Sequence, residues 1–202
     1  MIISSFNQVI KEIEKIKISR KKINIMLTGG NSIRSFYRYL SKKIDKKFLK
    51  KTNFYLSDER VFENEKNTNF YFVKNALFNK FKLKDIRLFK FYDTEKTINE
   101  NLNFYEKHLE KMDIIFLSYG NDGHVASLFP NLKTIISKKK VCFVYNKNNK
   151  FKFRMSVKKE FIMKSKNKFL FFLGKKKKKI FLNQKKKIIK DKIFKNFKIV
   201  LS

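Results

Sequence analysis

Residues 113–124 read Asp-Ile-Ile-Phe-Leu-Ser-Tyr-Gly-Asn-Asp-Gly-His, an apolar run that stops at a cluster of polar residues and glycines. A short apolar run bounded by turn residues is typical of a strand buried on both faces, and it predicts a strand over 113–117. Two further runs have the same form, at 23–27 before Thr-Gly-Gly and at 53–56 before Ser-Asp-Glu-Arg. The sequence therefore predicts three buried strands that each end in a polar cluster.

Amphipathic helices are expected between the strands. Apolar residues recur at helical spacing after Ser5, Ile33, Thr68 and Thr97. Ser5 and Thr68 are predicted N-caps, and Thr97 has a capping-box partner, Glu100, three residues later. A further helix is expected over 175–182, and later strands are expected at 142–145, 153–157, 169–173 and 197–201.

The alternation of strands and helices predicts the fold class. It favours a three-layer α/β fold, Rossmann-like, with a mostly parallel sheet and helices on both faces. The whole chain, residues 1–202, is expected to form a single domain, because no linker or internal repeat interrupts the pattern. In such folds the functional site lies beyond the carboxyl ends of the strands, where the three polar clusters are predicted to meet.

The composition indicates the cellular setting of the protein. The sequence lacks an apolar run of the ~20 residues that a membrane helix needs. Residues 1–5 do not have the pattern of a secretory signal. Cys142 is the only cysteine, which excludes an intramolecular disulfide and a zinc site built from several cysteines. We therefore expect a cytoplasmic protein that does not bind membranes.

The net charge of +33 ordinarily suggests a protein that binds nucleic acid. However, 44 of the 50 basic residues are lysines, and they are accompanied by many Ile, Asn and Phe residues. This bias is typical of AT-rich coding DNA, whereas proteins that read nucleic acids use arginine forks and aromatic platforms in recognisable modules. We therefore interpret most lysines as solvated surface residues and expect no specific nucleic-acid partner.

The most specific motif follows the strand predicted at 113–117. Residues 120–130 read Gly-Asn-Asp-Gly-His-Val-Ala-Ser-Leu-Phe-Pro. They resemble the signature Asp-Gly-His-x-Ala-Ser-Leu-Phe-Pro of the 6-phosphogluconolactonases, which belong to the wider group of glucosamine-6-phosphate isomerases and deaminases. The resemblance extends over residues 5–182, and its other segments are Leu-Thr-Gly-Gly at 27–30, Asp-Glu-Arg at 58–60, Asn-Phe at 69–70, Arg-Met-Ser-Val at 154–157 and Gly-Lys-Lys-Lys at 174–177.

This resemblance implies a fold of the sugar-phosphate isomerase type and a hydrolase that opens 6-phospho-D-glucono-1,5-lactone in the oxidative pentose phosphate pathway. It implies that His124 is the general base for the attacking water and that Asp58 binds sugar hydroxyls or orients that water. Arg60 would hold the substrate and stabilise developing negative charge. The residues implied in substrate and phosphate binding are Gly29, Gly30, Ser32, Asn69, Arg154 and Lys177.

The implied partner is a small phosphorylated sugar lactone. The reaction needs a nucleophilic water, a base and groups that stabilise an oxyanion, so that no cofactor and no metal are expected. We expect the protein to be a monomer or a weak dimer.

Structural interpretations of the same residues remain open. His124 could be a turn histidine with satisfied hydrogen bonds, and Asp58 and Arg60 could pair across a strand end. Asp122 is interpreted as a turn former rather than a catalytic acid. Lys177 lies within a run of five lysines, so that its assignment depends on its distance from the preceding glycine.

Two departures from the family pattern concern the site. Ile33 stands where the phosphate turn usually has proline, a residue that pre-sets the start of a helix. Ser118 stands where the Asp-Gly-His signature usually begins with glycine. Neither departure removes a catalytic group.

Two rival functions are weighed against lactone hydrolysis. Glucosamine-6-phosphate deaminases resemble this chain but carry a glutamate where Phe129 stands, and a phenyl ring cannot move a proton. A degenerate, basic RNA-binding protein is the other rival. The retention of His124, Asp58 and Arg60 together argues against it.

Overall fold

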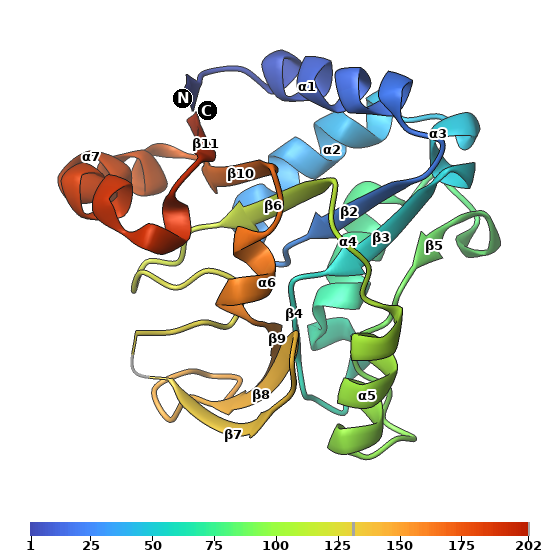
Figure 1. Cartoon of the computed structure of the whole chain (residues 1–202), viewed down its shortest axis with the longest axis vertical. Helices are drawn as coiled ribbons and strands as arrows, with labels where there is room; N and C mark the ends of the chain where they lie inside the picture. The colour runs from blue at the N-terminus through green and yellow to red at the C-terminus, as the bar shows by residue number, and fades with distance from the viewer. Residues whose placement is uncertain (131, 202) are drawn as a thin grey trace.

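The structure is a computed structural model that describes residues 1–130 and 132–201, with the side chain of Lys192 excepted. Its largest feature is a seven-stranded sheet with the order β1-β11-β10-β6-β2-β3-β5 (Figure 1). All neighbouring strands in it run parallel, which confirms the predicted sheet. Its strands are β1 (Ile2–Ile3), β2 (Ile23–Leu27), β3 (Thr52–Leu56), β5 (Arg87–Leu88), β6 (Ile114–Ser118), β10 (Asn167–Phe172) and β11 (Phe197–Leu201).

Helices cover both faces of this sheet, as predicted. On one face, the ring of Phe36 in α2 (Arg34–Lys43) lies 5.3 Å from that of Phe116 in β6. On the other, Tyr105 in α5 (Ile98–His108) packs edge-on against Tyr55 in β3. The strand registers place Phe116 and Tyr55 on opposite faces, because successive side chains of a strand alternate. The remaining helices are α1 (Phe6–Ser19), α3 (Lys46–Lys50), α4 (Asn69–Leu77), α6 (Lys159–Met163) and α7 (Lys175–Lys190), with short 3₁₀ segments η1 (Asn31–Ile33), η2 (Glu65–Asn67), η3 (Leu83–Asp85) and η4 (Lys192–Phe194).

A second, antiparallel sheet differs from the sequence expectation. Its order is β4-β9-β8-β7, from the strands β4 (Asp58–Arg60), β7 (Lys133–Ser137), β8 (Val141–Tyr145) and β9 (Phe153–Val157). The strands predicted at 142–145 and 153–157 exist, but they pair with each other antiparallel. The physical reason is the short connection between them, because a parallel crossover needs a dozen or more residues.

The second sheet also redirects the chain after β3. Only Ser57 separates β3 in the large sheet from β4 in the small one, and β4 pairs antiparallel with β9. The Asp-Glu-Arg cluster is therefore a strand of its own rather than a loop after a strand. This crossing fixes Asp58 and Arg60 on regular backbone, paired with Ser156 and Arg154 of β9.

The predicted helix caps are confirmed. The side chains of Ser5 and Thr68 accept hydrogen bonds from backbone N–H groups of α1 and α4, and Thr97 forms a capping box with Glu100. The helix predicted over 175–182 is longer and extends to Lys190.

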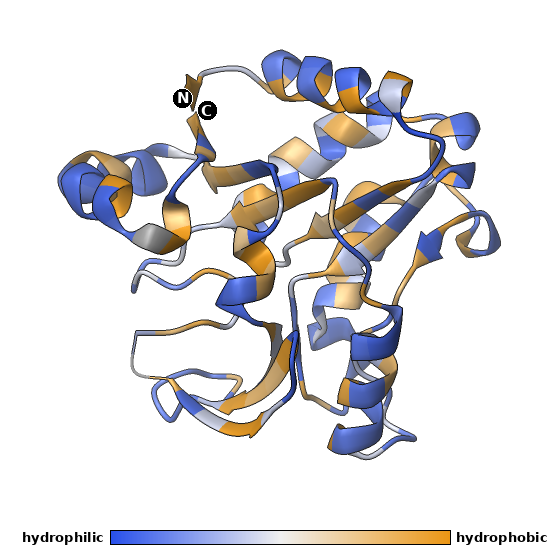
Figure 2. Cartoon of the chain, in the orientation of Figure 1, coloured by the Kyte–Doolittle hydropathy of each residue, from blue (hydrophilic) through white to orange (hydrophobic). Residues whose placement is uncertain are grey.

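The strands of the large sheet are mainly apolar, and the outward helix faces are hydrophilic (Figure 2). Within the residues that the structure describes, no helix is both long and apolar enough to cross a membrane.

Candidate active site

A cavity of about 330 Å³ lies at the carboxyl ends of β2, β3 and β6. This is where parallel α/β sheets hold their ligands. The cavity is lined by all nine residues predicted for the site, which are Gly29, Gly30, Ser32, Asp58, Arg60, Asn69, His124, Arg154 and Lys177. The structure therefore brings together residues that are up to 148 positions apart in the sequence, from Gly29 to Lys177.

The glycine turn after β2 forms one wall. Gly30 has a φ of +94°, a left-handed conformation that favours glycine. η1 and then α2 follow directly, and among the described residues no side chain caps the start of η1. Exposed N–H groups at a helix start, with the positive end of the helix dipole, suit an anion.

Asn69 packs against this turn from the start of α4. Its side-chain Nδ2 donates to the carbonyl of Asp58 at 3.0 Å, and the residue is 2% exposed. A Cβ on Gly29 would lie 1.9 Å from Oδ1 of Asn69. Glycine at position 29 is thus required by a contact with Asn69.

Two hydroxyl groups meet between β2 and β6. Oγ of Ser32, in η1, lies 2.7 Å from Oγ of Ser118, the last residue of β6, and both residues line the cavity. Either hydroxyl can be the donor.

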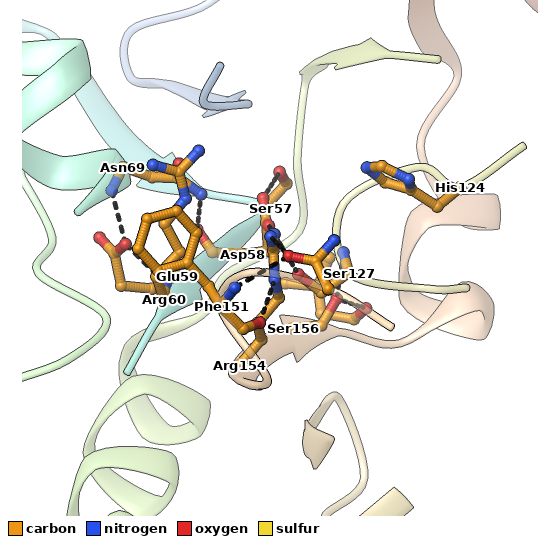
Figure 3. A network of polar contacts seen from close by, with 12 residues as sticks. Ser57, Asp58, Glu59, Arg60, Asn69, His124, Ser127, Phe151, Arg154 and Ser156 are labelled. Carbon is orange, nitrogen blue, oxygen red and sulfur yellow. Dashed lines mark hydrogen bonds and ion pairs between the residues drawn. The ribbon is translucent and has the colours of Figure 1, made fainter. Parts of the chain in front are cut away.

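Asp58 is held in a buried polar network at the edge of the cavity (Figure 3). The residue is 4% exposed, and its carboxylate accepts hydrogen bonds from Ser57 Oγ at 3.0 Å and Ser127 Oγ at 2.7 Å. Nη1 of Arg154 lies 3.6 Å from Oδ2 of Asp58. A carboxylate that stays buried this deeply needs such partners.

Arg154 is fixed from several sides. Its Nη2 donates to Oδ1 of Asn149 at 2.8 Å, and its guanidinium lies 5.4 Å from the ring centroid of Phe129. Burial lowers the pKa of Arg154, and the nearby Asp58 carboxylate opposes that change. The ion pair predicted as a structural alternative therefore involves Asp58 and Arg154, rather than Asp58 and Arg60.

Arg60 has different partners. Its Nη1 donates to the carbonyl of Asn67 at 2.8 Å, and its guanidinium lies 4.8 Å from the ring centroid of Phe151. These contacts hold the cation at the cavity, two positions along β4 from Asp58, which also lines it.

Glu59, between those two residues, points away from the cavity lining. Its carboxylate accepts backbone N–H groups from Arg60 at 2.7 Å, Asn69 at 2.5 Å and Phe70 at 2.8 Å. Burial raises its pKa to about 7, and these hydrogen bonds act in the opposite direction. Glu59 therefore ties β4 to the start of α4, and so positions Asn69.

His124 lies on the loop after β6. Its Nδ1 shares a short hydrogen bond with Oδ1 of Asp122, and its ring centroid is 4.4 Å from that of Phe129. Burial acts to raise the pKa of Asp122, but the His124 bond and other donors outweigh it, so that the pKa lies below its ordinary value. Asp122, which the sequence suggests is a turn former, thus also contacts the predicted base.

Gly120 leaves room for that base. A Cβ at position 120 would lie 2.2 Å from Nδ1 of His124. Gly120 N–H also donates to the carbonyl of His124 at 2.7 Å, which closes the loop on itself.

Lys177 enters the cavity from the first turn of α7. Its Nζ donates to the carbonyl of Tyr119, and burial lowers its pKa. Gly174 precedes the helix with a φ of +85°. Lys177 is therefore the member of the lysine run that lines the cavity, as the spacing from Gly174 predicted.

Sequence reasoning gave no role to several residues of the site. Ser127 and Ser118 contact predicted site residues through their hydroxyls, and the Glu59 carboxylate accepts the backbone N–H of Asn69. Ser127 lies inside the quoted signature, so that the motif contained a signal for it. Within residues 1–130 and 132–201, no group of three or more His, Cys, Asp and Glu side chains could hold a metal ion.

Two curated proteins are similar to this chain in sequence. The chain is 30% identical over 169 residues to a 6-phosphogluconolactonase of Borreliella burgdorferi, which covers 78% of this chain and 71% of the relative. It is 25% identical over 173 residues to a probable 6-phosphogluconolactonase of Dictyostelium discoideum, covering 80% and 73% of the two chains.

Solved structures share the fold. The crystal structure of 6-phosphogluconolactonase from Thermotoga maritima superposes with a TM-score of 0.79 at 23% identity, over 100% of this chain and 97% of that one. A putative 6-phosphogluconolactonase from Neisseria gonorrhoeae gives a TM-score of 0.80 at 19% identity, over 100% and 98%. The family model for glucosamine-6-phosphate isomerases/6-phosphogluconolactonase matches residues 1–191, and the chain belongs to this family.

Proposed function

We propose that this protein hydrolyses 6-phospho-D-glucono-1,5-lactone to 6-phosphogluconate, as a step of the oxidative pentose phosphate pathway in the cytoplasm. The observation that carries the proposal is the pairing of His124 with Asp122 at a cavity that also holds the cations of Arg60, Arg154 and Lys177. A base beside several cations suits water attack on an anionic ester.

The contact with Asp122 makes His124 suitable as a base. When the Asp122 carboxylate accepts Nδ1–H, the lone pair of Nε2 stays free to take a proton. The same carboxylate stabilises the imidazolium that results. Carboxylate–histidine pairs act in this way in other hydrolases.

The reaction then proceeds in two proton transfers. His124 takes a proton from water as its oxygen bonds to the lactone carbonyl carbon, and the carbonyl electrons move to oxygen. When the tetrahedral oxyanion collapses, the bond to the ring oxygen breaks, and the imidazolium returns the proton to that oxygen. The products are the C5 hydroxyl and a carboxylic acid that ionises in water.

The remaining residues bind and orient the substrate in this proposal. Gly29, Gly30, Ser32 and Lys177 hold the 6-phosphate, with the turn giving N–H donors and the lysine a positive charge. Arg60 and Arg154 provide positive charge beside the ring and the developing oxyanion. Asp58 uses its remaining lone pairs for a sugar hydroxyl or the reacting water, and Asn69 shapes the wall that the Gly29 turn forms.

Phe129 favours lactone hydrolysis over deamination. Its ring lies against both His124 and Arg154, at the position where deaminases carry glutamate. A phenyl ring offers no proton for opening an amino sugar ring. We therefore propose a lactonase rather than a glucosamine-6-phosphate deaminase.

An assay of two substrates tests the proposal. Freshly generated 6-phosphogluconolactone hydrolyses unaided, so that the measurement is the acceleration over a blank without protein. We expect clear acceleration with the lactone and no ammonia release from glucosamine 6-phosphate. Ammonia release, or a lactone rate equal to the blank, would overturn the proposal.

A further inference from the structure

Ser118 lines the cavity, although the family resemblance assigns it no role. It occupies a position where the related signature usually has glycine. In this chain it adds a hydroxyl group to the cavity, at 2.7 Å from Oγ of Ser32. A side chain that reaches a proposed phosphate ligand in this way can affect binding.

The backbone of Ser118 is firmly placed. It ends β6 and pairs in register with Phe171 of β10, inside the large sheet. Ser32, by contrast, lies in η1, a single 3₁₀ turn between the glycine pair and α2. A hydroxyl on a strand is held more accurately than one on a turn, so that Ser118 can fix the rotamer of Ser32.

The direction of the shared hydrogen bond decides what the pair does. When two hydroxyls form a hydrogen bond, the proton of the donor lies between them. The accepting hydroxyl then keeps its own proton for another partner. When an anion lies at the turn, the favoured arrangement is a chain in which Ser118 donates to Ser32 and Ser32 donates to the anion. Each bond of such a chain strengthens the next.

We propose that Ser118 is a positioning residue for the substrate phosphate, and that it acts by donating a hydrogen bond to Ser32. The proposal rests on the proposed function and makes it more specific, because it assigns the Ser32 proton to a phosphate oxygen. A phosphate dianion accepts hydrogen bonds and donates none, so that it suits a site in which the Ser32 hydroxyl is a donor.

Four variants test the pair, namely Ser118→Ala, Ser118→Thr, Ser32→Ala and the double variant Ser32→Ala/Ser118→Ala. We expect Ser118→Ala to raise KM for the lactone about fivefold with kcat unchanged, and Ser32→Ala to raise it about tenfold. The double variant should be no worse than Ser32→Ala, because Ser118 acts through Ser32. Ser118→Thr keeps the hydroxyl, and its KM should equal that of the wild type.

Calorimetric titration with inorganic phosphate gives a second readout that needs no catalysis. The dissociation constant should change in the same order as KM across the four variants. Ser137→Ala, which removes an exposed hydroxyl from β7, serves as the control and should leave both quantities unchanged. Melting temperatures identify any variant that fails to fold.

Two results would overturn the proposal. One is a double variant whose KM is the product of the two single effects, which would make the hydroxyls independent ligands. The other is a folded Ser118→Ala protein with wild-type KM and wild-type phosphate affinity. If the wild type binds phosphate but does not accelerate lactone hydrolysis, the proposed function fails while phosphate titration still decides the role of Ser118.

Discussion

Gly29 and Asn69 come from different elements and occupy the same small space. A Cβ at position 29 would lie 1.9 Å from Oδ1 and 2.2 Å from Cγ of Asn69. The contact joins the turn after β2 to the start of α4, and the Glu59 carboxylate holds that helix start in place. One wall of the cavity therefore depends on a glycine for packing rather than for backbone freedom.

Gly29→Ala should destabilise the protein by about 2 kcal/mol, which is typical of overpacking in a closed site. Asn69→Gly should cost less in the Gly29→Ala background than in the wild type, because it removes the clashing atoms. Urea unfolding of the wild type, both single variants and the double variant measures this coupling. Strictly additive losses would contradict the contact.

Asp122→Asn should lower kcat about 10- to 100-fold, with KM little changed. The amide removes the carboxylate that accepts Nδ1–H of His124, so that Nε2 is no longer assured a free lone pair. Steady-state kinetics with the lactone measures the effect. Asp85→Asn, a change in η3 outside the cavity lining, is the matched control. A wild-type kcat in Asp122→Asn would show that the pair has no catalytic part.

Glu59 should make stability fall as the pH rises. Its pKa in the folded protein is about 7, against an ordinary value of 4.5. Between those values the folded state binds more protons than the unfolded state, so that the free energy of unfolding decreases with pH, by up to about 3 kcal/mol. Urea unfolding from pH 4.5 to 7.5 measures the slope.

Glu59→Gln removes this titration and supplies the control. The amide keeps an acceptor for two of the three backbone N–H groups but sets its own N–H₂ against the third, so that the variant should be less stable overall. Its free energy of unfolding should change less over the same pH range. Equal pH slopes in the two proteins would assign the dependence to another group.

Salt should stabilise this chain. A formal net charge of +33 on 202 residues repels itself in the folded state, and ions screen that repulsion over ~10 Å at 0.1 M. We expect the melting temperature to rise by several degrees between about 10 mM and 200 mM NaCl. A melting temperature that falls over this range would mean that favourable ion pairs dominate.

The sequence predicted five strands of the large sheet because they are continuous apolar runs, and three helix starts because Ser5, Thr68 and Thr97 are standard caps. It did not predict the two-residue edge strands β1 and β5, which are too short to give a pattern. Ile114–Ser118 and its neighbours needed no long-range information. The small sheet was not predicted, because strand periodicity does not reveal which strand pairs with which. The short connection between β8 and β9 was the available signal for antiparallel pairing.

The site could be predicted as a set of residues but not as a set of contacts. The motifs name His124, Asp58 and Arg154, and the structure places them at one cavity. Their hydrogen-bond partners depend on packing, as with Ser127 on Asp58 and Asp122 on His124. The motif contains Ser127 and Asp122, but it does not show which atoms they contact, and Ser127 lies 69 positions from Asp58.

The rate of lactone hydrolysis by His124→Gln tests the central claim most directly, measured beside the wild type and the unaided reaction. We predict that the wild type accelerates ring opening well above the blank and that His124→Gln lowers kcat about 100-fold or more, at an unchanged melting temperature. A folded His124→Gln protein with the wild-type rate would contradict the account.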